Sequence, residues 1–174
     1  MATWLIDPTH SEVGFKVKHL VVSTASGKFT SFEGKIEAEK DDFSDAKISF
    51  SADINSIHTG NEQRDGHLKS PDFFDAEKFG KLTFVSTKVE SIGGPEYQVT
   101  GDLTIKDVTE KIVLNVEFGG LEKSPYGHTV AGFEVTTKID RQKYGLTWNA
   151  VTEAGGLVVG NDVKVIANIE LIKQ

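Results

Sequence analysis

The stretch "SEVGFKVKHL" (residues 11–20) decides the fold, because its apolar and polar residues alternate. Val13, Phe15 and Val17 occupy every second position, and charged residues stand between them on the other face. Successive side chains of a β-strand point to opposite faces, so a period of two predicts a strand with one buried face and one wet face. His19 continues the apolar side of the repeat, and we expect its imidazole to point inward.

Seven further segments alternate in the same way. They lie at residues 32–38, 48–54, 82–84, 97–105, 112–118, 131–139 and 163–171. The connections between them are rich in Gly, Asp, Asn and Pro, which form turns. Short turns join antiparallel neighbours, so eight strands without intervening helices predict an all-β fold, either an up-and-down barrel or a sandwich. An eight-stranded barrel has room for packed side chains or for one ligand.

One segment interrupts the alternation. The stretch "NEQRDGHLKS" (residues 61–70) has no period of two and no β-branched residue. Thr59 and Glu62 stand at the Ser/Thr-x-x-Glu spacing of a helix capping box. We therefore expect one short helix near residues 60–69. We expect it to cross the barrel, followed by a turn that carries Phe73, Phe74 and Phe79 toward the sheet.

Composition limits the class of protein. The 174 residues, 38% of them hydrophobic, are enough for a single domain over residues 1–174 with a buried core. A net charge of -7 argues against nucleic-acid binding, and the absence of cysteine excludes disulfides and thiolate ligands. No apolar run approaches the roughly eighteen residues of a membrane span, and the first residues do not resemble a signal peptide. We therefore expect a cytoplasmic protein without a transmembrane segment.

Candidates for catalysis and metal binding are few. Ser70 precedes an Asp-rich turn, and the chain has no Gly-x-Ser-x-Gly segment of the kind that exposes a nucleophilic serine. The five histidines stand at none of the common zinc spacings. The sequence therefore predicts no catalytic residue, no metal and no cofactor.

Five blocks of sequence follow one another in a characteristic order. They are "WLIDPTHSEVGFKVKHL" (4–20), "GKF" (27–29), "RDGHLKSPDFFD" (64–75), "GDLTIKDVT" (101–109) and "RQKYG" (141–145). Together they resemble the YceI-like polyisoprenoid-binding proteins. The resemblance implies a lipocalin-like, eight-stranded antiparallel barrel whose interior holds a long isoprenoid or similar amphiphile, without enzymatic activity or metal.

On this basis we expect a soluble binding protein that holds the lipid for storage, sequestration or transport. The expected wall of the cavity is the inward apolar stripe of Phe15, Val17, Phe84, Val99, Leu103, Leu114, Phe133 and Val135. His19, Arg64 and His67 are expected to meet a polar head group or to fix the helix over the cavity. The expected partner is a polyisoprenoid or another long-chain amphiphilic lipid, and a homodimer is left open.

Two alternatives stay open from the residues. The barrel could be an enzyme, an isomerase or hydrolase acting on an apolar substrate with His19 or His67 as general base. It could also be an interaction protein with a solid core. Fold resemblance does not by itself establish function.

Overall fold

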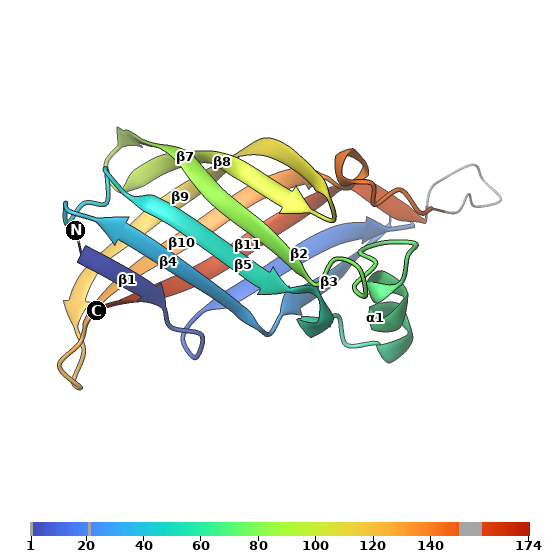
Figure 1. Cartoon of the computed structure of the whole chain (residues 1–174), viewed down its shortest axis with the longest axis horizontal. Coiled ribbons are helices and arrows are strands. Elements are labelled where there is room, and N and C mark those ends of the chain that lie inside the picture. Colours follow the sequence, from blue (N-terminus) through green and yellow to red (C-terminus); the bar gives the residue numbers. More distant parts are fainter. Residues whose placement is uncertain (1, 21, 150–157) are drawn as a thin grey trace.

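The chain folds into a closed antiparallel β-barrel with one short helix (Figure 1). The computed structural model describes residues 2–20, 22–149 and 158–174. Its strands are β1 (Ala2–Ile6), β2 (Glu12–His19), β3 (Ser23–Phe29), β4 (Phe32–Ala38), β5 (Lys47–Asp53), β6 (Ile57–His58), β7 (Lys81–Gly93), β8 (Glu96–Ile105), β9 (Val108–Lys123), β10 (Thr129–Asp140) and β11 (Val159–Lys173). Helix α1 (Glu62–Lys69) follows β6, and two 3-10 turns are η1 (Ile54–Ser56) and η2 (Arg141–Tyr144).

Eight strands close the barrel. The ring runs β1-β4-β5-β7-β8-β9-β10-β11 and returns from β11 to β1, with every pair antiparallel. Strands β2, β3 and β6 extend this wall toward α1, because β11 pairs with β2 over its first part and with β1 at its end. The closed ring confirms the predicted up-and-down barrel and excludes the sandwich.

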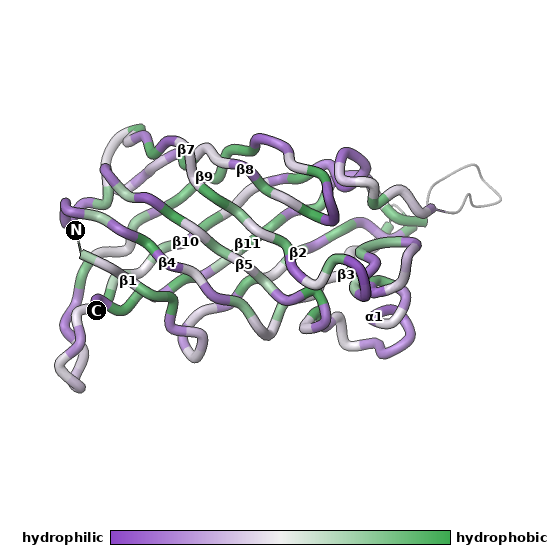
Figure 2. The backbone as a smooth tube through the Cα atoms, viewed as in Figure 1, coloured by the Kyte–Doolittle hydropathy of each residue, from purple (hydrophilic) through white to green (hydrophobic). Residues whose placement is uncertain are grey.

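Three strands have no counterpart in the predicted alternation, namely β1, β3 and β6. Strand β3 has only small residues, Ala25 and Gly27, at its middle inward positions. Glycine at residue 27 leaves room for the Phe15 ring, because a Cβ atom there would lie 2.5 Å from Cζ of Phe15 on the neighbouring strand. The large ring of β2 therefore supplies the bulk that β3 lacks. Elsewhere hydrophobic and hydrophilic residues alternate along the strands as expected (Figure 2).

The predicted helix is present, but another residue caps it. Helix α1 spans Glu62–Lys69, and the side chain of Asn61 accepts a hydrogen bond from the backbone N of Arg64 at 3.1 Å. The expected capping box is therefore wrong, because the hydroxyl of Thr59 donates to the buried carboxylate of Asp65 instead. None of the described helices is long and apolar enough to cross a membrane.

The two ends of the barrel are filled differently. Near the chain termini, Phe43 packs between Trp4 and Phe133, with ring centroids 5.0 and 5.1 Å away. At the opposite end, α1 and the turn after it lie over the barrel (Figure 1), and they contribute Phe73 to the core. Aromatic side chains thus cover both ends and leave the middle of the barrel as the place for a cavity.

Candidate functional site

A cavity of about 300 Å³ lies inside the barrel, and its surface is almost entirely apolar. Its lining extends from Ile6 and Leu171, in the strands that carry the chain termini, to Leu68 of α1 at the other end. Volumes of this order are those of small-molecule sites, which are mostly apolar with a few polar groups. The interior is therefore a slot and not a solid core.

All eight residues of the expected apolar wall line this cavity. They come from β2 (Phe15, Val17), β7 (Phe84), β8 (Val99, Leu103), β9 (Leu114) and β10 (Phe133, Val135). Inward residues of neighbouring strands also meet, since Phe84 is opposite Leu103 and Val99 is opposite Leu114. The structure thus brings the predicted wall together, and contact of these residues with a ligand stays a prediction.

Two glycines, Gly27 and Gly101, make room for aromatic rings of the cavity wall. The ring of Phe15 lies against Gly27, and the ring of Phe84 lies against Gly101, where a Cβ atom would be 2.5 Å from the Phe84 Cζ. A glycine under an aromatic ring lets the ring lie along the sheet. Both rings therefore contribute apolar surface without filling the lumen.

Two polar side chains in the lining, Thr137 and Tyr97, are hydrogen-bonded to the backbone. Thr137 donates from its hydroxyl to the carbonyl oxygen of Val113 at 2.8 Å, and Tyr97 donates to that of Asp42 at 2.7 Å. Burial, helped by the negative charge of Asp42, raises the pKa of Tyr97, so this phenol stays protonated at neutral pH. Because these donors are already satisfied, the lumen offers a ligand apolar contact.

Arg141 is the one charged side chain in the described lining, and it is 3% exposed. Its guanidinium donates to four backbone carbonyls that belong to the segment after η2 and to the start of β11. The acceptors are Gly160 (2.8 Å from Nε), Trp148 (3.0 Å from Nη1), Val159 (3.3 Å from Nη2) and Leu146 (from Nη1). Arg141 therefore clamps two segments of chain at the α1 end of the barrel.

The burial of Arg141 has an electrostatic consequence. Burial lowers the pKa of Arg141, and the charge of Asp140 offsets part of that effect. Its guanidinium carbon also lies 5.9 Å from the centre of the Phe73 ring, within reach of a cation-π contact. A guanidinium keeps its proton in proteins, so this is a buried positive charge held by carbonyl dipoles and an aromatic face. Sequence reasoning missed its role, since the acceptors are scattered backbone atoms without a residue signature.

Helix α1 and the turn after it form a cover over this end of the barrel. Arg64 and His67 stabilise this cover and do not line the cavity. Arg64 is exposed, and it donates from Nε to the Thr59 hydroxyl at 2.8 Å and from Nη2 to the Thr59 carbonyl at 2.7 Å. His67 lies with Nε2 2.9 Å from a carboxylate oxygen of Asp72. We expected this pair either to meet a polar head group or to fix the helix over the cavity. These contacts favour the second role.

His67 also joins an aromatic group over the barrel end. Its ring lies edge-on to Trp148 and to Phe73, with centroids 4.6 and 5.0 Å away. Trp148 and Phe73 are themselves 5.6 Å apart. Since Arg141 holds the Trp148 carbonyl, the cover and the segment after η2 are joined at this point. Trp148 was not among the residues predicted from sequence.

His19 does not point into the cavity as expected. His19 is exposed at the end of β2, and it is not part of the cavity lining. Alternation assigns a residue to one face of its strand. It does not show how far along the strand the opposite side of the barrel extends. At the end of β2 the inward face no longer faces a closed interior, so the imidazole meets solvent.

Fold and cavity together define a closed β-barrel with an apolar interior and a helical cover. The YceI-like domain model matches residues 4–171. A UPF0312 protein of Staphylococcus aureus strain USA300 is 43% identical over 171 residues, which are 98% of this chain and 97% of that protein. This chain belongs to the YceI-like family.

Solved structures agree on the fold. A crystal structure of a Campylobacter jejuni YceI protein is 33% identical, covers 97% of this chain and 96% of its own, and superposes with a TM-score of 0.75. A domain from Saccharophagus degradans, described as polyisoprenoid binding and implicated in plant cell wall breakdown, is 17% identical with a TM-score of 0.72, and the match covers 98% of each chain. At that identity the second likeness shows the fold alone.

Proposed function

We propose that this chain binds a long isoprenoid or similar amphiphilic lipid inside the barrel, for storage, sequestration or transport. The observation that carries the proposal is the apolar cavity, lined by all eight residues of the predicted wall. The polyisoprenoid-binding description of the Saccharophagus degradans domain, which has the same fold, supports it. Residues 1–174 would act as one binding domain. The cytoplasmic location expected from the sequence stays a prediction.

Energetics favour a long ligand. Burying one CH₂ group contributes about 0.8 kcal/mol, so a five-carbon isoprene unit contributes roughly 3 to 4 kcal/mol when fully buried. Association costs on the order of 4 to 15 kcal/mol in lost freedom. One unit does not offset that cost, whereas several units do. The described lining is almost entirely apolar and offers a head group few partners, so the chain and not the head would supply the affinity.

The enzyme alternative finds less support. A general base has to come within hydrogen-bond reach of the proton it removes, directly or through one water. His19 and His67 both lie outside the cavity lining, and the described lining contains no histidine, carboxylate or lysine. The Saccharophagus degradans domain of the same fold is likewise described as polyisoprenoid binding. Binding is therefore the function that the geometry favours.

A pair of substitutions on one strand tests the proposal. Leu114 of β9 lines the cavity, whereas its neighbour Val113 is 43% exposed on the outer face. Leu114→Trp fills part of the lumen, and Val113→Trp adds the same bulk outside. We expect Leu114→Trp to reduce uptake of an added polyprenol at least tenfold, with Val113→Trp close to wild type. Equal uptake by both variants, or none by wild type, would overturn the proposal.

A further inference from the structure

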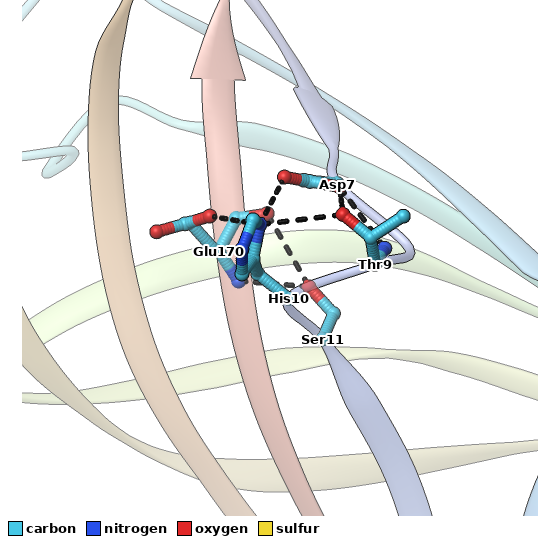
Figure 3. Close-up of polar contacts among 5 residues, drawn as sticks. All are labelled: Asp7, Thr9, His10, Ser11 and Glu170. Carbon is cyan, nitrogen blue, oxygen red and sulfur yellow. Dashed lines mark hydrogen bonds and ion pairs between the residues drawn. The ribbon is translucent and has the colours of Figure 1, made fainter. Parts of the chain in front are cut away.

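A second cluster of side chains lies outside the barrel, at the turn between β1 and β2. Asp7 and His10 of this turn meet Glu170 of β11, and one ligand atom from each lies within 4.8 Å of the others. Figure 3 shows the imidazole of His10 between the two carboxylates. The distances from its Nδ1 are 2.7 Å to Oδ2 of Asp7 and 3.2 Å to Oε2 of Glu170. Among the described residues this is the group that could hold a metal ion.

We infer that Asp7, His10 and Glu170 form a binding site for a divalent transition-metal ion on the outer wall of the barrel. The site stands apart from the lipid cavity, and the inference does not depend on the proposed function. One imidazole nitrogen and two carboxylate oxygens make a mixed N and O donor set, which suits ions such as Zn²⁺, Mn²⁺ and Co²⁺.

The spacing of the donor atoms fits such an ion. Ligands bound tetrahedrally to Zn²⁺ at about 2.0 to 2.2 Å are roughly 3.3 Å apart. Of the two separations from the His10 Nδ1, the 3.2 Å to Glu170 is close to that value, and the 2.7 Å to Asp7 is about 0.6 Å shorter. Metal binding therefore needs the His10 ring to move about half an ångström from the Asp7 carboxylate. All three ligand atoms already lie within 4.8 Å of one another, and the exposed side chain of His10 has room to move.

Charge balance points the same way. Two carboxylates face a single ring nitrogen, and Nδ1 carries at most one proton. Even when His10 is protonated, the three side chains together keep a net charge of about -1. A divalent cation bound to a neutral imidazole brings the net charge to zero and contacts all three donors at once. The side chain of His10 is 68% exposed and that of Asp7 14%, so an ion reaches the group from the solvent side.

Backbone groups and neighbouring hydroxyls hold the carboxylate of Asp7 and the backbone of Glu170 in place. Oδ1 of Asp7 accepts from the backbone N of Thr9 at 3.0 Å and from its hydroxyl at 2.7 Å, which leaves Oδ2 directed at His10. The backbone N of Glu170 donates to the Ser11 hydroxyl at 2.9 Å, and its carbonyl accepts from the backbone N of Asp7 at 2.9 Å. Outer contacts of this kind orient metal ligands and raise affinity.

The location explains what a bound ion would do. Glu170 lies where β11 changes partner, since Asn168 still pairs with β2 and Leu171 already pairs with β1. An ion here would tie the β1–β2 turn to β11 across the point of barrel closure. Because the ion binds only the folded chain, a Zn²⁺ concentration about 100-fold above its Kd should raise Tm by roughly 5 to 10 °C.

Calorimetric titration of the untagged, chelator-treated full chain with zinc chloride tests the inference. We expect one Zn²⁺ per chain for wild type, and an affinity at least tenfold lower for Glu170→Gln and His10→Gln. The matched control is His67→Gln, because His67 faces only the single carboxylate of Asp72, at 2.9 Å. This variant should bind Zn²⁺ as wild type does.

Wild type itself provides a readout that needs no variant. In imidazole ¹⁵N spectra, the ring nitrogens of His10 should shift and saturate at one equivalent of Zn²⁺, while those of His67 stay in place. Absence of Zn²⁺ binding to wild type at millimolar metal would overturn the inference. So would unchanged binding by a folded Glu170→Gln variant, or a shift at His67 in place of His10.

Discussion

The ring of Phe15 fills the space that a side chain at Gly27 would need. A Cβ atom at residue 27 would lie 2.5 Å from Cζ of Phe15, and 2.8 Å from Cγ2 of Thr59. The two residues are opposite each other on β2 and β3. At this point the Phe15 ring alone lines the cavity, because Gly27 has no side chain. The volume of the lumen therefore depends on Gly27, although Gly27 does not line the cavity.

Gly27→Ala should shrink the cavity without removing any apolar residue from it. The added methyl group pushes the Phe15 ring inward, and overpacking of this kind costs roughly 1 to 3 kcal/mol. We expect lower polyprenol uptake, measured by extraction and mass spectrometry. The control is Gly132→Ala on β10, where a Cβ meets nothing within 4 Å. Equal uptake by the two variants would contradict this view of the wall.

Arg141→Met should destabilise the protein strongly. The substitution removes the donor from four backbone carbonyls at the α1 end, and an unpaired buried acceptor costs about 1 to 3 kcal/mol. We expect the free energy of unfolding in urea to fall by roughly 3 kcal/mol or more. Arg141→Lys should recover little of it, since an ammonium lacks the planar fork of donors. Lys143→Met, an exposed change in the same 3-10 turn, serves as the control and should have little effect.

The buried phenol of Tyr144 should lower the free energy of unfolding at high pH. Its hydroxyl is buried without a hydrogen-bond partner among the described residues, and burial, with a contribution from the charge of Glu110, raises the pKa of Tyr144 to about 12. Above the ordinary pKa of about 10 the unfolded chain loses this proton while the folded chain keeps it. The contribution of Tyr144 is thus intact below about pH 10 and is lost as pH rises toward 12.

Tyr144→Phe isolates this effect. The variant removes a buried hydroxyl that has no hydrogen-bond partner in the described part of the chain, so its stability near pH 7 should equal or exceed that of wild type. Urea unfolding at a series of pH values between 8 and about 11.5 gives the comparison. The gap between variant and wild type should widen in favour of the variant above about pH 10. A constant gap would contradict the assignment of Tyr144.

Arg64→Ala should loosen the cover while leaving the cavity intact. Arg64 makes two hydrogen bonds to Thr59 and does not line the lumen. We expect faster amide hydrogen exchange in α1 and faster release of a bound polyprenol, with the amount of lipid bound at equilibrium nearly unchanged. Lys69→Ala, at the end of the same helix, is the control for a general loss of helix stability. A large loss of equilibrium binding would instead place Arg64 at the ligand head.

The cavity wall could be predicted from sequence because it follows from a local repeat. Phe15 and Val17 share one face of β2 whatever the rest of the chain does, and the same holds for Val99 and Leu103 on β8. His19 obeys the same repeat, yet it is exposed, because the place where a barrel ends depends on strands distant in sequence.

Features that depend on tertiary contacts could not be predicted in this way. Strand β3 carries Gly27 in place of an apolar side chain, because Phe15 of another strand covers it. The hydroxyl of Thr59 would have capped an isolated helix, but in the fold it binds Asp65, and Asn61 takes the cap. Arg141 acts through carbonyl oxygens, which every residue has.

Native mass spectrometry of the purified wild-type chain tests the central claim most directly. The account predicts a population carrying one lipid per chain, released on activation and identified after solvent extraction as a long apolar chain. Added polyprenol should fill whatever fraction is empty, and Leu114→Trp should block that filling. A spectrum with the lipid-free mass alone, both before and after incubation with polyprenol, would contradict the account.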